Sequence, residues 1–173
     1  MTHPDIATTI AIALGVSACI TDVWQARIPN ALTIPAALAG VAWHAWVEGT
    51  SGALTSVGGL GVGLLMWLPL YALGGIGAGD VKLLAAFGAW LGPSDTVRVA
   101  LAAAIAGGVF AVFIACRFRY MAQAWTNVRC ALMQWRVTGI APVEGLTLVD
   151  APGPRLAYAV PMLVGLGVTL WVR

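Results

Sequence analysis

The chain has 173 residues, of which 60% are hydrophobic and 9% are charged, and its formal net charge is +2. A soluble globular domain carries roughly 25% charged residues, so this composition, with a mean hydropathy of +0.89, excludes an ordinary soluble protein. The small net charge gives no reason to expect a nucleic-acid partner. Three cysteines without a C-x-x-C pair indicate neither a disulfide framework nor a zinc site. We therefore predict one integral membrane domain over residues 1–173.

Six apolar runs predict an all-α bundle of about six transmembrane helices. A helix needs about 20 residues to cross about 30 Å of hydrocarbon, and the chain offers runs at residues 5–23, 31–47, 53–73, 80–94, 96–116 and 154–172. The fourth run is the weakest, because its uncharged part, residues 83–94, rises only about 18 Å as a helix. Tilting or local thinning of the bilayer would accommodate it. Five spans and a re-entrant segment are the alternative.

The segment between the fifth and sixth runs, residues 117–153, carries an amphipathic pattern. Apolar residues recur at steps of three and four, at Phe118, Met121, Trp125, Val128, Leu132 and Trp135. A helix of this kind with basic residues on its other face is typical of one that lies on an anionic membrane surface. We expect a cytoplasmic interfacial helix with membrane lipid as its partner. Packing over the functional site, or against another protein, is an open alternative.

The arginines predict the orientation of the chain in the membrane. Cytoplasmic loops carry an excess of Lys and Arg. If Arg27 faces the cytoplasm, the alternation of the spans puts Arg117, Arg119, Arg129, Arg136 and Arg155 on the same side. Arg98 and Arg173 are then left on the outer side, and both chain termini face away from the cytoplasm. The oligomeric state is not indicated.

Two acidic residues lie where an apolar chain tolerates them least. Asp22 ends the first run, and Asp80 begins the fourth, after a glycine-rich turn. A carboxylate at membrane depth is costly, so each is a candidate functional residue, although Asp22 could also be an ordinary interfacial side chain. Between the two residues the chain crosses the membrane twice. Two crossings return it to the same side, so we expect Asp22 and Asp80 at the same depth.

Aspartic proteolysis is the chemistry that needs two carboxylates and nothing else, and the pair therefore indicates it. Two neighbouring acids share one proton, so that the ionised acid activates a water and the protonated acid donates a hydrogen bond to the scissile carbonyl. We expect no metal and no cofactor, because His3 and His44 are not spaced as ligands. No convergent Ser, His and Asp set is present to suggest a serine triad.

Two motifs then point to a family. The segment Asp22-Val-Trp-Gln-Ala-Arg-Ile-Pro-Asn30, together with Gly75-Ile-Gly-Ala-Gly-Asp-Val-Lys-Leu83, resembles the type IV prepilin peptidases, which are GxGD aspartic proteases of the membrane. The resemblance covers about residues 10–112. It implies that Asp22 and Asp80 are the catalytic pair and that the substrate is a prepilin or pseudopilin. It also implies a bacterial inner membrane location, with the leader peptide cleaved at the cytoplasmic edge.

Five further residues are expected to bind substrate or shape the site. Gly77 and Gly79 would let the backbone leave the helix beside Asp80, so that an extended substrate can approach; helix packing is their alternative role. Pro29 suits the first turn of a helix, and Asn30 can satisfy free amide groups there. Lys82 could act on an Asp charge, bind lipid phosphate or extend to the membrane surface.

The short connection between the first two spans narrows the expected activity. Bifunctional family members carry a cytoplasmic insertion there and also N-methylate the new terminus, whereas only residues 25–30 join the two spans here. The resemblance is therefore to the short, peptidase-only proteins of tight-adherence (Flp-type) pili. Two other classes stay open: a proton- or cation-coupled transporter that uses the same acids, and a non-catalytic subunit of pilus assembly. Tyr158 lies in a poorer match to the family and receives no role.

Overall fold

The computed structural model describes residues 4–143 and 157–173, and their regular secondary structure is entirely α-helical. The helices are α1 (Pro4–Gln25), α2 (Asn30–Ala72), α3 (Ala78–Leu91), α4 (Pro93–Arg117), α5 (Met121–Thr138) and α6 (Ala159–Trp171). The predicted all-α class is confirmed. Arg155, His3 and the first residues of the expected sixth span lie outside the described ranges.

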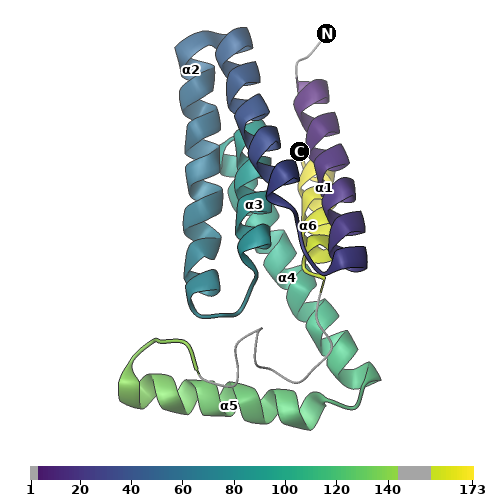
Figure 1. Ribbon diagram of the computed structural model, residues 1–173, viewed down its shortest axis with the longest axis vertical. Helices are drawn as coiled ribbons and strands as arrows, with labels where there is room; N and C mark the ends of the chain where they lie inside the picture. The colour runs from purple at the N-terminus through teal and green to yellow at the C-terminus, as the bar shows by residue number, and fades with distance from the viewer. Residues whose placement is uncertain (1–3, 144–156) are drawn as a thin grey trace.

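Helix α2 is a hairpin of two helical arms. Its 43 residues would extend about 65 Å if straight, which is twice the hydrocarbon thickness of about 30 Å. Gly49 breaks the helix with φ of 66° and ψ of −146°, a conformation that strongly favours glycine because it lacks a β-carbon. Figure 1 shows the two arms running side by side in opposite directions. One helix thus contains the second and third expected spans.

Helix α3 is the centre of the bundle. Its Leu83, Leu84 and Phe87 are fully buried, and in Figure 1 it lies among the α2 arms, α1 and α6. A helix of 14 residues rises only about 21 Å. Because protein rather than lipid surrounds α3, it need not match the thickness of the bilayer. This enclosure explains how the short fourth run is accommodated.

Small residues on the second arm of α2 allow α3 to approach closely. Gly52, Ser56, Gly59 and Gly63 are buried at steps of three and four, the small-residue spacing typical of packed membrane helices. A β-carbon added at Gly59 or at Gly88 would collide with the backbone of the other helix. The Ser56 hydroxyl donates a 2.6 Å hydrogen bond to the Ala89 carbonyl. These two backbones are therefore in direct contact.

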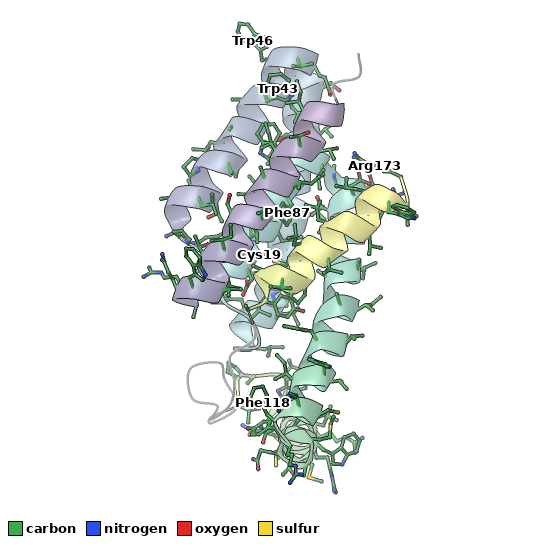
Figure 2. The ribbon with its side chains drawn as sticks, turned by 90° about the vertical axis from the view of Figure 1, so that its right-hand side faces the viewer. Cys19, Trp43, Trp46, Phe87, Phe118 and Arg173 are labelled. Carbon is green, nitrogen blue, oxygen red and sulfur yellow. The ribbon has the colours of Figure 1, made fainter. Side chains whose placement is uncertain are left out.

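Helices α1, α4 and α6 complete the bundle, and α5 lies crosswise at one end. Helix α6 packs between α1 and α4 (Figure 2), and Gly165 approaches the backbone of Val99 and Ala103. Helix α5 contacts the end of α4 (Figure 1). Its exposed apolar residues are Met121, Trp125, Val128, Leu132, Met133 and Val137.

Among the described residues, three helical segments are long and apolar enough to cross a membrane by length and composition: Ile6–Gln25, Asn30–Ala72 and Pro93–Arg117. Helix α6 is apolar but shorter, at 13 residues. The protein is thus an integral membrane protein, and a count of six crossings stays a prediction. At the end of the bundle opposite α5, buried Asp95 pairs with Arg98 at 3.1 Å and with Arg173.

Candidate active site

Asp22 lies in the last turn of α1, at the end of the bundle that faces α5. Its side chain is half-buried, and its Oδ2 accepts a 3.1 Å hydrogen bond from the Ala159 amide, the first residue of α6. Ala26 then adopts a positive φ of 49°, which turns the chain out of the helix toward α2. Asp22 is therefore held by a free amide at the start of a helix that is distant in sequence.

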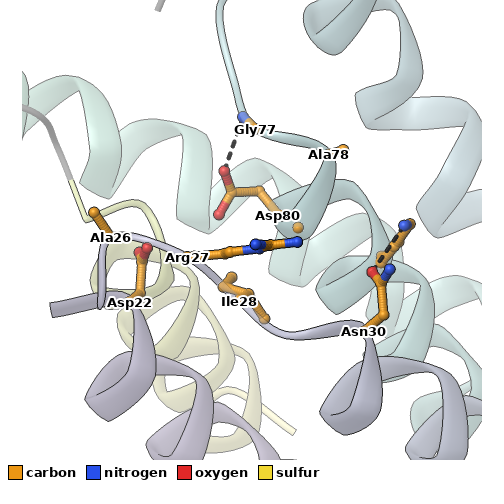
Figure 3. Close-up of a pocket in the computed structure, with 10 residues that line it drawn as sticks. Asp22, Ala26, Arg27, Ile28, Asn30, Gly77, Ala78 and Asp80 are labelled. Carbon is orange, nitrogen blue, oxygen red and sulfur yellow. Dashed lines mark hydrogen bonds between the residues drawn. The ribbon is translucent and has the colours of Figure 1, made fainter. Parts of the chain in front are cut away.

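Asp80 lies in the first turn of α3 and is 8% exposed. Gly77, in an extended conformation, precedes the helix, and its amide donates a 3.0 Å hydrogen bond to Asp80 Oδ2. This is the reach expected of an acid that caps the start of its own helix. Figure 3 shows the bond as a dashed line, with the other carboxylate oxygen turned away from Gly77.

The structure brings Asp22 and Asp80 together in one cavity of about 320 Å³. Its lining residues are Asp22, Ala26, Arg27, Ile28, Asn30, Gly77, Ala78, Gly79, Asp80 and Lys82 (Figure 3). Each acid accepts a hydrogen bond at the start of a helix, where the helix dipole favours negative charge. Two carboxylates facing one cavity repel each other when both are ionised. Protonation of one of the two acids would remove this repulsion.

The two sequence motifs are in contact across this cavity. Ile28 is buried, and a β-carbon added at Gly79 would lie 3.0 Å from Ile28 Cβ. Lys82 Nζ donates a 2.8 Å hydrogen bond to Asn30 Oδ1. The connection between α1 and α2, which follows Asp22, is thus attached to the helix that carries Asp80.

These contacts correct three expected roles. Asn30 does not cap α2, because Pro29 is the residue before the helix and no side-chain cap is formed there; Asn30 binds Lys82 instead. Gly79 lies within α3, and its missing side chain makes room for Ile28 rather than leaving the backbone free. Gly77 alone has the expected extended conformation beside Asp80. Pro29 precedes α2 in an extended conformation instead of lying in its first turn, and it is not among the residues that line the cavity.

Tyr158 also lies near Asp80, although no role is predicted for it from the sequence. The two residues line a second cavity of about 380 Å³, and the Tyr158 ring packs edge-on against Trp67 with centroids 5.2 Å apart. The Ala159 amide was likewise missed. A backbone amide carries no sequence signal, and Tyr158 is far from both motifs along the chain, so only folding reveals these neighbours.

Within residues 4–143 and 157–173, no group of three or more His, Cys, Asp or Glu side chains could hold a metal ion. His44 does not line the cavity of Asp22 and Asp80. Its ring contacts Glu48 at 3.6 Å and the Trp90 carbonyl at 3.2 Å.

Comparison with known proteins identifies a family that the chain matches. Residues 9–112 match the type IV leader peptidase family. Two curated relatives, prepilin leader peptidase/N-methyltransferases of Burkholderia pseudomallei strains 1026b and K96243, are each 37% identical to this chain over 92 residues. The match covers 50% of this chain but 30% of each relative, so it represents less than a third of the relatives' length. No solved structure matches the chain.

Proposed function

We propose, because this chain belongs to the type IV leader peptidase family, that it is an aspartic endopeptidase that removes the leader peptides of prepilins or pseudopilins. The observation that carries the proposal is the single cavity lined by Asp22 and Asp80. In this proposal the two acids are the catalytic pair. Arg27, Asn30, Gly77, Gly79 and Lys82 shape the cavity around them.

The proposed reaction needs one proton shared by the two acids. The ionised carboxylate accepts a proton from a water, and the resulting hydroxide attacks the scissile carbonyl carbon. The protonated acid donates a hydrogen bond to the carbonyl oxygen as negative charge develops there. When the tetrahedral intermediate collapses, the C–N bond breaks and the leaving amine takes a proton from the pair. The amides of Gly77 and Ala159 favour the negative charge that the pair carries before the water is deprotonated and again after the amine has left.

The test of this function is cleavage of a leader-bearing substrate by the purified protein in lipid vesicles. We expect one cut, at the junction between a basic leader and an apolar helix, identified by mass spectrometry of the new N-terminus. We also propose that the chain lacks N-methyltransferase activity, because residues 26–29 alone join α1 to α2 and no methyl-donor fingerprint is present. With S-adenosylmethionine added, the new terminus should stay unmethylated. A methylated product would refute this part, and an uncut substrate would refute the peptidase.

We propose that the acids face the cytoplasm in a bacterial inner membrane, in the peptidase-only branch associated with tight-adherence pili. The arginine distribution supports this orientation. A membrane-impermeant thiol reagent offers a test, because Cys130 on α5 is exposed. In a Cys19→Ser, Cys116→Ser background we expect Cys130 to be labelled in inverted membrane vesicles and protected in intact spheroplasts. Equal labelling in spheroplasts would contradict the orientation.

We expect the Lys82–Asn30 hydrogen bond to position the acids rather than to tune their charge. Lys82→Met and Asn30→Ala should each reduce kcat about threefold, since each removes the same partly exposed hydrogen bond. The double variant should therefore have about the same kcat as either single variant. Lys82→Arg keeps a donor and should lose less. A Lys82→Met loss with a shifted pH profile, and no loss in Asn30→Ala, would instead mean that the Lys82 charge acts on the acids.

A further inference from the structure

Asp80 lies between two cavities of different chemistry. The first, which holds Asp22, is lined by the polar side chains of Arg27, Asn30 and Lys82. The second, of about 380 Å³, is lined by Gly75, Ile76, Asp80, Ala104, Gly107, Gly108, Ala111 and Tyr158. Apart from Asp80 and Tyr158, every residue in this second set has an apolar side chain or none. A chain that passes Asp80 from one cavity to the other thus moves from a polar to an apolar environment.

The wall of the second cavity along α4 is built of small residues. Ala104, Gly107, Gly108 and Ala111 leave the helix backbone accessible. A β-carbon at Gly107 would lie 2.6 Å from Tyr158 Oη, whereas one at Gly108 would have no neighbour within 4 Å. Tyr158 therefore closes the cavity at Gly107. At Gly108 there is room for another helix to pack closely, as small residues allow in membranes.

This small-residue wall continues into a surface that faces lipid. Leu101, Ile105 and Val112 each expose more than half of their surface, and the positions 101, 105, 108 and 112 follow one another on one face of α4. In a membrane protein such an aliphatic face contacts the hydrocarbon. The second cavity therefore lies at the edge of the lipid-facing surface, where an apolar helix can enter from the side.

Asp80 connects this second cavity to the candidate active site, because it lines both cavities. The residue is more than nine-tenths buried, and among the described residues only its Oδ2 has a hydrogen-bond donor, the Gly77 amide. The other carboxylate oxygen has no donor there and is not enclosed by protein, so a ligand or water can reach it. The cavity is the space from which such a partner can come.

From these features, and resting on the proposed function, we propose that the second cavity seats the first turns of the substrate's apolar helix, on the mature side of the scissile bond. The helix enters laterally from the lipid and packs on Ala104, Gly108 and Ala111, while the basic leader lies on the side of the first cavity, which Asp22 also lines. The substrate changes from a polar leader to an apolar helix at the bond that is cut. The lining of the two cavities changes in the same way at Asp80, so the apolar helix matches the second cavity.

A matched pair of glycine variants tests the docking. Gly108 and Gly167 are both exposed helical glycines whose added β-carbon meets nothing within 4 Å, so Gly108→Leu and Gly167→Leu should both fold. With a substrate carrying a basic leader, a glycine and a helix of about 20 apolar residues, Gly108→Leu should raise KM about tenfold or more with kcat nearly unchanged. Gly167→Leu should match the wild type. A peptide that ends one residue after the junction has no helical turn to place in this cavity and should be cut equally by all three proteins.

The docking is wrong if Gly108→Leu leaves KM unchanged, if both leucine variants raise it equally, or if the short peptide is affected as strongly as the helical substrate. Crosslinking separates docking from catalysis. In an Asp80→Asn background, a photoreactive residue at position 108 should crosslink the helical substrate, and one at 167 should not. Equal yields at both positions, or none at 108, would overturn the docking. Failure of the wild type to cut any substrate would instead overturn the peptidase, since crosslinking does not need cleavage.

Discussion

Asp80→Asn should lower the rate of leader cleavage by about 10³-fold or more, the usual weight of a general acid–base group. Asparagine keeps the shape of the side chain and can still accept the hydrogen bond of the Gly77 amide, so α3 should start normally. It cannot take a proton from water, nor exchange one with Asp22. The rate is measured on the purified variant in vesicles by the appearance of the cut product, with substrate in excess so that kcat is compared.

The controls separate a chemical loss from a folding defect. Asp22→Asn should lose a similar factor, and the double variant should lose little more than either alone, because the two acids act as one unit. Asp95→Asn removes a buried acid at the opposite end of the bundle, where it pairs with Arg98 and Arg173. This variant should be less stable but should keep its turnover per folded molecule. Full cleavage by Asp80→Asn or by Asp22→Asn would exclude the proposed mechanism.

Gly59→Leu should cause the largest loss of stability, at least about 3 kcal/mol, at the upper end of overpacking costs. A β-carbon at Gly59 would collide with the backbone of Gly88 and Gly92. A backbone cannot move aside as a flexible side chain can, so the second arm of α2 must separate from α3. Thermal unfolding in detergent, followed by tryptophan fluorescence, should show a clearly lower Tm and less folded protein.

Gly61→Leu provides the matched control for that variant. Gly61 lies two residues away on the same helix arm, and its added β-carbon would meet nothing within 4 Å. The same substitution there should leave Tm close to that of the wild type, since it adds apolar surface without a collision. Equal Tm values for Gly59→Leu and Gly61→Leu would mean that α2 and α3 do not pack through Gly59.

Much of the site could be predicted before any fold was known. A carboxylate in an apolar chain is expensive wherever the chain places it, so Asp22 and Asp80 stand out by composition alone. Their common side follows from counting crossings, because each span reverses the side of the membrane. Counting the crossings could not show whether the segments that carry Asp22 and Asp80 contact each other. The contact depends on Ile28 packing against Gly79 and on Lys82 reaching Asn30, which are pairings between segments about fifty residues apart.

The sequence by itself determined that this protein lies in a membrane, that it is helical and that Asp22 and Asp80 are its candidate functional acids. These conclusions follow from local properties: apolar composition, run length and the cost of a buried charge. Tertiary structure decided the rest. It placed Ala159 and Tyr158 beside the acids and packed Ile28 against Gly79. It also enclosed the short α3 in protein. The physical reason is that close packing between helices depends on which small residues meet across an interface, and many pairings of apolar faces satisfy the same hydrophobic pattern.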